Sequence, residues 1–322
     1  MKLRAFSKLI DQIRDMDHMQ RSILLDVLTH LSDDHQVLET IESRLDADGK
    51  CPFCSHAHYY RHGFANGLQR YRCMSCKRTF NALTGTPLAR LRHKNKWLRY
   101  IKAMTESLTI RKAAALVDLN RKTSFRWRHR FLAWIANDHP GALHGITEAD
   151  ETYLLESYKG SRHLARKSRK RGGSASKRGL SKEQICILIA RDRSGGTVDF
   201  VTGKGPVSTL SLKNTLKPVL DEDALLVTDG HSAYKSFCET ESLSHEIINL
   251  SKGERVKGAF HLQNINAYHS RFKNWLQRFH GVATKYVTNY LGWRRSLEQH
   301  PAISPESLLG IALGRFPQLK GT

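Results

Sequence analysis

The first half of the chain has apolar residues at helical spacing. Within residues 1–48 they lie three or four positions apart, the repeat of one face of an α-helix, at Leu9, Ile13, Met16, Ile23, Val27 and Leu31. This spacing predicts short packed helices that end near Gly49. Residues 90–132 have a helical pattern as well, whereas residues 51–80 contain short β-like pieces among paired cysteines.

The second half, from Gly145 onward, alternates between strands and helices. Apolar runs with the length of buried strands occur at 185–190, 197–201, 224–228 and 245–249. Helices are predicted over 208–219, 261–279 and 284–298, and Ser304-Pro305 is typical of the N-cap and first turn of a last helix. The alternation predicts an α/β domain within a multidomain α+β protein.

Composition indicates the kind of partner. The 322 residues include 52 Lys and Arg against 30 Asp and Glu, a net charge of +22. This excess of positive charge indicates a polyanionic partner, with nucleic acid favoured over an anionic membrane surface. Binding to a membrane surface would require a basic amphipathic helix with bulky apolar residues opposite, and no segment is a clear candidate. Neither a run of 18 apolar residues nor a signal peptide is evident, so we expect a cytoplasmic protein that binds no membrane.

Positive charge is concentrated in two stretches. Residues 90–132 contain thirteen Lys and Arg but two acids. Residues 159–182 contain ten Lys and Arg, together with Gly and Ser, and no acid. Because the second stretch interrupts the alternation of strands and helices, we expect it to be a mobile basic insertion outside the core.

Two pairs of cysteines have the spacing of a metal site. Cys51-Pro-Phe-Cys54 and Cys73-Met-Ser-Cys76, separated by 18 residues, predict four thiolate ligands around one structural Zn²⁺ ion. His56 and His58 are close enough to replace a cysteine ligand, and redox-active or buried cysteines are the alternative. Several basic and aromatic residues lie between the pairs, so the predicted module is a zinc ribbon that binds nucleic acid.

The stretch TIRKAAALVDLNRKTSFRWRHRF, residues 109–131, has the pattern of a helix-turn-helix. Thr109 would cap the first helix, and residues 118–120 would form the turn. The second helix, residues 121–131, would be the recognition helix, and it offers DNA the side chains of Arg121, Lys122, Thr123, Ser124, Arg126 and Arg128. The alternative is a basic solvated helix in an all-α spacer.

Carboxylates stand at the end of one predicted strand and within another. The run LLVTDG reads as a buried strand that ends at Asp229, and GITEADETYL (145–154) offers Glu148, Asp150 and Glu151 on alternating faces. Downstream, HLQNINAYHSRFK (261–273) places Asn266, His269 and Lys273 on one helical face. Two strand acids followed by a helix-borne polar ligand is the order of a ribonuclease-H-like two-metal nuclease, and hard oxygen ligands suit Mg²⁺ or Mn²⁺.

With these motifs the chain resembles bacterial insertion-sequence transposases of the DDE superfamily, in the group with an N-terminal zinc ribbon. The resemblance covers about residues 50–295. It rests on the cysteine pairs and on five further stretches, LQRYRC..C.RTFNALTGTPLARLRHK (68–94), ADETY (149–153), KRGLSKEQICILIARDRSG (177–195), VTDGHSAY (227–234) and the 261–273 helix.

The resemblance implies a catalytic site. Asp150 and Asp229 would be the two aspartates of the triad, Asn266 would hold the third position, which is usually Glu, and Lys273 would be the basic residue seven positions later. Asp150, Asp229 and Asn266 would bind the catalytic Mg²⁺ or Mn²⁺. Because an amide oxygen carries no charge, the second ion should be held more weakly. His261 and His269 are expected at the helix surface or at DNA phosphate, and Cys186 and Cys238 as buried thiols.

The expected organisation is a helical N-terminal segment (1–48), the zinc ribbon (49–85), the helix-turn-helix (90–135), a ribonuclease-H-like catalytic domain (143–300) and a C-terminal helical tail (301–322). The function implied is a transposase that binds the element's terminal inverted repeats and target DNA, as a homo-oligomer on DNA, and cuts and joins strands. The rival reading is a domesticated, catalytically inactive DNA-binding regulator with the same fold.

Overall fold

The computed structural model describes residues 3–164, 166–169, 173–249 and 252–314. The chain forms two compact units. Unit 1 combines Met1–Phe131 with Ile303–Thr322, and unit 2 is Leu132–Ala302. The predicted C-terminal tail therefore belongs to unit 1, and its residues 315–322 lie outside the described residues.

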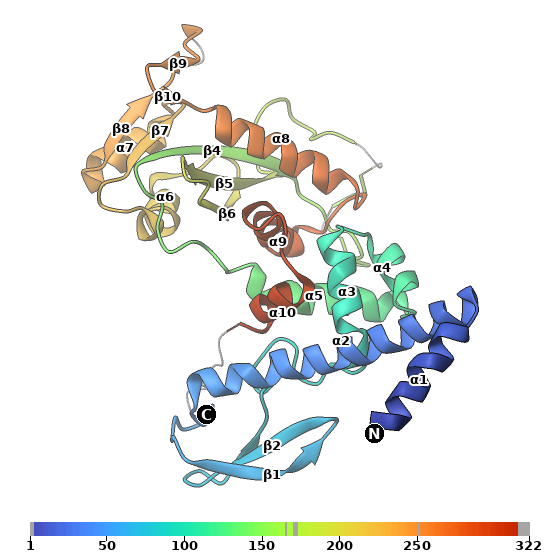
Figure 1. Cartoon of the computed structure of the whole chain (residues 1–322). Coiled ribbons are helices and arrows are strands. Elements are labelled where there is room, and N and C mark those ends of the chain that lie inside the picture. Colours follow the sequence, from blue (N-terminus) through green and yellow to red (C-terminus); the bar gives the residue numbers. More distant parts are fainter. Residues whose placement is uncertain (1–2, 165, 170–172, 250–251, 315–322) are drawn as a thin grey trace. The chain divides into compact units, whose positions relative to one another are not determined.

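Unit 1 begins with two helices, α1 (Leu3–Asp15) and α2 (His18–Asp48) (Figure 1). We expected short helices, but α2 runs for 31 residues. Asp17 and Gln20 form a capping box at its start, and Gly49, in the left-handed conformation, ends it by donating its N–H to the Leu45 carbonyl. Neither Gly nor Pro occurs between these ends, so the helix continues.

The cysteine-rich region folds as a three-stranded antiparallel sheet of β1 (Tyr59–Ala65), β2 (Leu68–Cys73) and β3 (Thr79–Phe80). Asn66 and Gly67 both have positive φ, the requirement of the tight turn that joins β1 to β2. Edge-to-face contacts of Tyr59 with Tyr71 and Phe80 form its small aromatic core. The module is too small to bury a large apolar core.

The rest of unit 1 is helical. A short 3-10 turn, η1 (Lys94–Lys96), leads into α3 (Trp97–Thr105), α4 (Ile110–Leu116) and α5 (Arg121–Ile135). The Thr109 side chain accepts a hydrogen bond from the Lys112 N–H, so the predicted N-cap is confirmed. The turn before α5 contains Asp118 at positive φ. The core between the helices consists of Trp97, Tyr100, Trp127 and Phe131.

The last helix, α10 (Pro305–Leu313), completes unit 1. It starts as predicted, because the Ser304 side chain accepts a hydrogen bond from the Ser307 N–H. It packs against α2 and α3 and buries Leu308, Leu309 and Leu313. Arg44 on α2 donates to the Gly314 carbonyl and to the Ala82 carbonyl, which ties α10 to the segment after β3.

Unit 2 is built on a five-stranded mixed sheet, which confirms the predicted α/β architecture. The strand order is β6-β5-β4-β7-β8. β4 pairs with β5 antiparallel and with β7 parallel. The bounds are β4 (Ile146–Leu155), β5 (Gln184–Asp192), β6 (Thr197–Lys204), β7 (Leu225–Thr228) and β8 (Ser244–Ile247).

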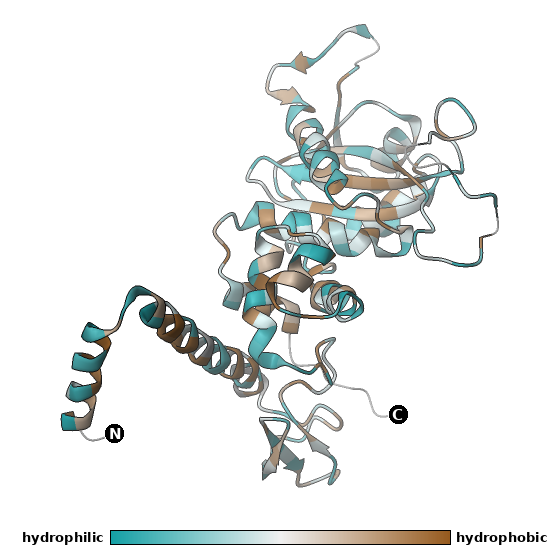
Figure 2. Cartoon of the chain, turned by 90° about the vertical axis from the view of Figure 1, so that its right-hand side faces the viewer, coloured by the Kyte–Doolittle hydropathy of each residue, from teal (hydrophilic) through white to brown (hydrophobic). Residues whose placement is uncertain are grey.

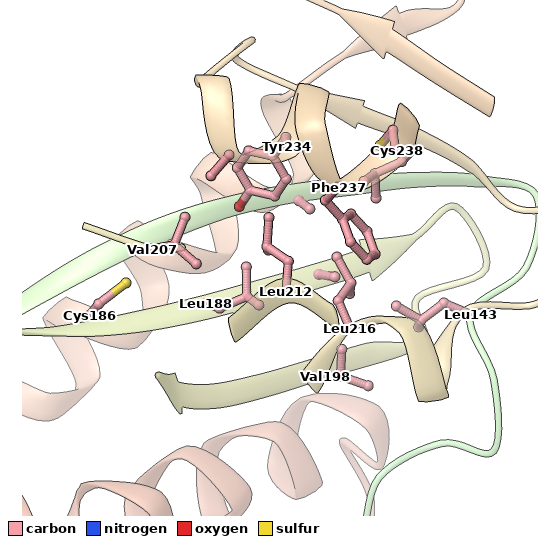
Figure 3. Packing of buried hydrophobic residues seen from close by; sticks show 14 residues of the cluster. Leu143, Cys186, Leu188, Val198, Val207, Leu212, Leu216, Tyr234, Phe237 and Cys238 are labelled. Carbon is pink, nitrogen blue, oxygen red and sulfur yellow. The ribbon is translucent and has the colours of Figure 1, made fainter. Parts of the chain in front are cut away.

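Helices cover both faces of this sheet. On one face α6 (Thr209–Thr215), followed by η2 (Lys217–Val219), and α7 (Ser232–Glu241) pack on a buried apolar cluster to which Leu212, Tyr234 and Phe237 contribute (Figure 3). On the other face α8 (Gln263–Gln277) contacts β4 and β5, and α9 (Val287–Gln299), preceded by η4 (Thr284–Tyr286), contacts β6. A two-residue hairpin, β9 (Val256–Lys257) and β10 (Phe260–His261), precedes α8.

A buried ion pair fixes α9. The Arg295 guanidinium pairs with Asp199 on β6, both groups 1% exposed, and it also donates to the Ala136 and Asp138 carbonyls. One turn earlier, Gly292 allows close packing, because an added Cβ would lie 2.5 Å from the Ala136 Cα. A buried charge with this many partners orients the helix more than it stabilises the fold.

The basic insertion, between β4 and β5, contains neither helix nor strand in the residues that are described. Two of its described residues, Arg169 and Ser176, bond to the residues that flank the insertion. Arg169 pairs with Glu183 at 2.8 Å and donates to the Glu156 carbonyl, and the Ser176 N–H donates to Glu183. Residues 165 and 170–172 of the insertion lie outside the described residues. Within the described ranges, no helix has both the length and the hydropathy needed to cross a bilayer.

Candidate functional site

The four cysteines come together in unit 1. Their Sγ atoms all lie within 4.8 Å of one another, with Cys51 and Cys76 at 3.7 Å and Cys54 and Cys73 at 3.5 Å. The first cysteine of each pair is buried. This is a closed four-thiol cluster, and its donor set fits a tetrahedral ion such as Zn²⁺.

The two CxxC turns have the same backbone geometry. The Cys51 N–H donates to the His56 carbonyl and the Cys73 N–H to the Arg78 carbonyl, five residues on in each case. Ser55 and Lys77, each four residues after the first cysteine, both have positive φ. Because the two turns share this geometry, they bring both pairs of thiols to one site.

The thiols differ in acidity. Burial raises the pKa of Cys51 to about 12, whereas a hydrogen bond from the His56 backbone lowers the pKa of Cys54 to about 6. Cys54 is therefore the thiol that is ionised at neutral pH. The His56 Nδ1 accepts a hydrogen bond from the His58 N–H, which occupies that ring nitrogen.

Two of the predicted carboxylates lie in unit 2, where the interior strands β4 and β7 run side by side. The parallel register pairs Glu148 with Val227, and two more residues along each strand lead to Asp150 and Asp229. Asp229 follows the last residue of β7, and its Oδ1 accepts the His231 N–H at 3.0 Å. The two predicted aspartates therefore lie near each other, and the Asp229 charge acts on Asp150.

Burial and charge repulsion raise the pKa values of two of these acids. Burial, reinforced by the negative charges of Glu151 and Asp229, raises the pKa of Asp150 to about 7, although the Glu151 amide and Lys273 act in the opposite direction. Burial and Asp229 also raise the pKa of Glu151. The negative charges of Glu151 and Asp229 thus both act on Asp150, and a cation bound beside Asp150 would offset this repulsion.

The helix α8 brings two of the remaining predicted residues, His269 and Lys273, close to Asp150. His269 is buried with its Nδ1 3.8 Å from the Asp150 Oδ2. Burial and the nearby Lys273 charge lower the pKa of His269 to about 4, so the imidazole is neutral at pH 7 and this contact is not an ion pair. Asn266 and Lys273 are exposed on the helix, and the Lys273 charge acts on Asp150.

Glu148 has a role that the sequence did not indicate. It is fully buried and accepts hydrogen bonds from the Ile265 N–H and the Asn264 side chain, both at 3.0 Å. Arg193 and His261 lie 3.3 and 3.4 Å from it. Glu148 therefore holds the first turn of α8 against β4. Its position two residues before Asp150, on the same face of the strand, was the available signal.

The expectation for His269 is wrong. We expected His261 and His269 at the helix surface or at DNA phosphate. His269 is 7% exposed and packs beside Asp150, and the His261 ring contacts Arg193 and Glu148. Helical spacing alone could not distinguish an inward from an outward histidine, because that depends on where β4 lies.

Two of the residues expected to contact DNA are buried. Ser124 and Arg128 are both 0% exposed. The Ser124 hydroxyl donates to the Ile110 carbonyl, and Arg128 donates to the Leu108 carbonyl, so both hold α4 and α5 together and are unavailable to DNA. Arg121, Lys122 and Arg126 are exposed on α5, as expected, and Thr123 is half-buried.

A basic groove in unit 1 adds residues that we had not singled out. Its volume is about 1260 Å³, and its walls come from α2, β2, the segment after β3, and α5. Its charged side chains, Arg90, Arg92, Lys94, Arg126 and Arg130, face one acid, Asp34. Arg130 donates to the Pro87 and Ala89 carbonyls, which fixes the wall, while Arg90 and Arg92 are exposed. A groove of this charge is suited to a polyanion.

Comparisons with known proteins identify the family of this chain. Residues 142–294 match the family described as ISXO2-like transposase domain. A protein in transposable element ISH50 of Halobacterium salinarum is 31% identical over 250 residues, which cover 75% of this chain and 82% of that protein. The chain belongs to the ISXO2-like transposase family.

Solved transposase structures are more distant. The pre-cleavage Mos1 transpososome aligns at 14% identity over 67% of this chain and 75% of that chain, with a TM-score of 0.28. The Mos1 paired-end complex with the left transposon end aligns at 13% identity over 68% and 79%, with a TM-score of 0.22. These scores are too low to establish a shared arrangement of the whole chain.

The raised pKa of Asp150 predicts how stability depends on pH without added Mg²⁺ or Mn²⁺. Folding raises this pKa from 3.8 to about 7, so the folded chain takes up a proton in that window and the free energy of unfolding falls as pH rises through it. Asp150→Asn removes the titrating group and therefore this pH-dependent loss of stability. Urea unfolding of unit 2 should show the variant more stable than wild type by roughly 2–4 kcal/mol at pH 8 and equal to it near pH 3.5. Equal stability at pH 8 would contradict the raised pKa.

Proposed function

We propose that this chain is an insertion-sequence transposase that binds the ends of its element and catalyses metal-dependent cleavage and transfer of DNA strands. Unit 2 would be a ribonuclease-H-like catalytic domain and unit 1 the DNA-binding part. The proposal rests mainly on the proximity of Asp150, within β4, to Asp229, which directly follows the adjacent parallel strand β7, in a member of a transposase family.

Asp150 and Asp229 would hold the divalent cation. Their carboxylates are the hard oxygen donors that Mg²⁺ and Mn²⁺ prefer. Burial, together with the negative charges of Glu151 and Asp229, raises the pKa of Asp150, so a bound cation would stabilise its ionised form. The third oxygen would come from Asn266 on α8, with Glu151 on the opposite face of β4 as the reserve. Two such ions supply an activated nucleophile and stabilise the leaving oxygen of an in-line phosphoryl displacement.

The remaining residues of the site would position the DNA and the carboxylates. Lys273, exposed two turns after Asn266, would contact the scissile phosphate or its neighbour. His269 is neutral at pH 7 and packed beside Asp150, so it would hold that carboxylate in place without neutralising it. Glu148 would fix the turn of α8 that carries Asn266, through its bond to the Ile265 N–H.

A catalytically inactive regulator is the second candidate, and Asn266 is the observation that favours it, because an amide adds no charge to the metal site. The two candidates share the same DNA-binding surface in unit 1. They differ in whether the acids of unit 2 hydrolyse phosphodiesters.

Cleavage of an end-containing DNA with Mg²⁺ or Mn²⁺ tests the proposal. Asp150→Asn and Asp229→Asn should each reduce strand cleavage and strand transfer by at least about 1000-fold, because each replaces a charged ligand with a neutral one of the same shape. End binding should stay within about twofold, since binding resides in unit 1. Asp223→Asn, an exposed acid just before β7, is the matched control and should retain activity. Cleavage that survives both substitutions would rule out this site.

Asn266→Glu separates the roles of Asn266 within the same experiment. If Asn266 is a ligand, the added carboxylate should lower the concentration of Mg²⁺ needed for half-maximal cleavage. If Asn266 contacts DNA phosphate, the new charge should weaken end binding and leave the metal dependence unchanged. The second result would exclude Asn266 from the metal site.

DNA binding would be divided between two surfaces of unit 1. Arg121, Lys122 and Arg126 at the exposed start of α5 would read base edges as the recognition helix of a helix-turn-helix. The basic groove, with Arg90 and Arg92, would hold the phosphate backbone. Arg126 lies on both surfaces. The groove and the recognition helix would therefore bind neighbouring parts of one duplex.

This division predicts that substitutions in the groove and in the recognition helix differ in their effects on the salt dependence and the sequence preference of DNA binding. Arg90→Ala and Arg92→Ala should weaken binding to specific ends and to random DNA equally, and each should reduce the slope of log K against log salt concentration by about 1. Arg121→Ala should instead reduce the preference for specific ends. Lys8→Ala on α1, exposed but outside the groove, is the control and should change neither. A groove variant that altered only sequence preference would contradict the assignment.

The four-thiol cluster should hold one Zn²⁺ per chain as the structural ion of a zinc ribbon. Cys54→Ser should lower the zinc content of purified protein to near zero and increase hydrogen exchange over residues 50–80, because metal binding and folding are coupled in small modules. Cys238→Ser, a buried thiol in unit 2, should leave both unchanged. Wild-type protein that contains no metal when purified under reducing conditions would refute the assignment.

A further inference from the structure

The helix α8 lies along β4 (Figure 1). Near the start of both elements, the buried Glu148 carboxylate accepts the Ile265 N–H at 3.0 Å. Further along both, the His269 Nδ1 lies 3.8 Å from the Asp150 Oδ2. The strand and the helix therefore run in the same direction, and the position of Asn266, next to Ile265, depends on how α8 is held along β4.

A third contact lies beyond the end of both elements and involves Lys159, four residues after Leu155 ends β4. The Lys159 ammonium donates to the His280 carbonyl at 2.9 Å and to the Gly281 carbonyl at 2.8 Å, with a longer bond of 3.5 Å to the Phe279 carbonyl. These carbonyls belong to the turn that follows α8. A lysine placed after the end of a helix satisfies carbonyls that the helix leaves without partners.

A reciprocal pair of hydrogen bonds lies beside this contact. The Ser157 N–H donates to the Thr284 Oγ1 at 2.9 Å, and the Thr284 N–H donates to the Ser157 carbonyl at 2.8 Å. We call Ser157, Lys159, residues 279–281 and Thr284 the α8 junction. The junction joins the chain that leaves β4 to the chain that leaves α8.

The turn after α8 has a backbone that needs such support. His280 and Gly281 both have positive φ, and left-handed backbone at a residue other than glycine persists where neighbouring contacts hold it. On the side of the helices, the Phe279 ring packs 4.9 Å from the rings of both Trp275 and Tyr290. Aromatic packing thus fixes the turn to α8 and α9, and the junction fixes it to the end of β4.

Lys159 is the first residue of the basic insertion, and composition alone would assign it to DNA. The described residues of this insertion are mostly hydrophilic (Figure 2). Lys159 is exposed, but its ammonium is bonded to backbone carbonyls and would have to leave them to reach a phosphate. Together with Glu148, it gives the strand an acid at the N–H end of α8 and a base at the carbonyl end, the arrangement that the helix dipole favours.

We propose that Lys159 is a positioning residue for strand cleavage. By holding the turn after α8 to the end of β4, it keeps the helix that carries Asn266 and Lys273 in register with the strand that carries Asp150. The inference rests on the proposed function, because it concerns the rate of that reaction. It assigns no contact with DNA or metal to Lys159 itself.

Single-turnover cleavage of end-containing DNA, measured over a range of protein concentrations, gives the maximal rate and the DNA affinity separately. Lys159→Met keeps the length of the side chain and removes the ammonium. The maximal rate should fall at least about tenfold, because small displacements of a catalytic group are costly. Affinity should stay within about twofold, since an ammonium bonded to carbonyls neutralises no phosphate. Lys167→Met, at an exposed position of the same insertion, is the matched control and should leave the maximal rate within about twofold of wild type.

Thr284→Val tests the junction without a change of charge. The Ser157 N–H loses its acceptor, so the maximal rate should fall while DNA affinity and its salt dependence stay unchanged. In the double variant with Lys159→Met, the reduction should be smaller than the product of the two single reductions, because both substitutions loosen one junction. Hydrogen exchange over residues 279–286 should be faster than wild type in each variant. Zinc content and the unfolding of unit 2 serve as checks on the fold.

Three outcomes would overturn the proposal. The first is a normal maximal rate in Lys159→Met with weaker DNA binding and a salt slope reduced by about 1, the result for a phosphate contact. The second is a normal maximal rate in Thr284→Val, and the third is an equal loss of rate in Lys167→Met. Wild type that does not cleave would instead refute the proposed function. Hydrogen exchange would then still decide whether Lys159 holds the turn.

Discussion

The parallel pairing of β4 with β7 is the contact on which the candidate active site depends. Continued by two residues, this register sets Asp150 beside Asp229. Because side chains alternate along a strand, a slip of one residue would turn Asp150 toward α7 and bring Glu151 to α8. The same alternation directs Glu148 to the first turn of α8, where it accepts the Ile265 N–H. One strand pairing therefore fixes both the acids and the helix that faces them.

The sequence predicted what depends on local signals. A buried strand that ends at Asp229, the two CxxC turns, and the caps at Thr109 and Ser304 each follow from residues within a few positions of one another. The membership in a transposase family, expected from the motifs, was confirmed by comparison. The roles of the individual acids and of Asn266 remain proposals.

What the sequence did not predict depends on distant packing. Ser124 and Arg128 were expected to face DNA, yet α3 and α4 cover that side of α5, and the two side chains bond to Ile110 and Leu108. His269 points inward because β4 lies beneath α8. The length of α2 was not predicted because the apolar positions that were counted stop at Leu31, although neither Gly nor Pro interrupts the helix between Asp17 and Gly49.

The position of α10 in the chain has a consequence for synthesis on the ribosome. Unit 1 is closed by α10, which buries three leucines against the first helices and comes after the whole of unit 2. At about 5–20 residues per second, Leu132–Ala302 takes roughly 10–30 s to translate. During that time the nascent N-terminal helices expose the surface that α10 will cover. Unit 2 can fold as it emerges, whereas unit 1 can reach its final state only after its neighbour has been made.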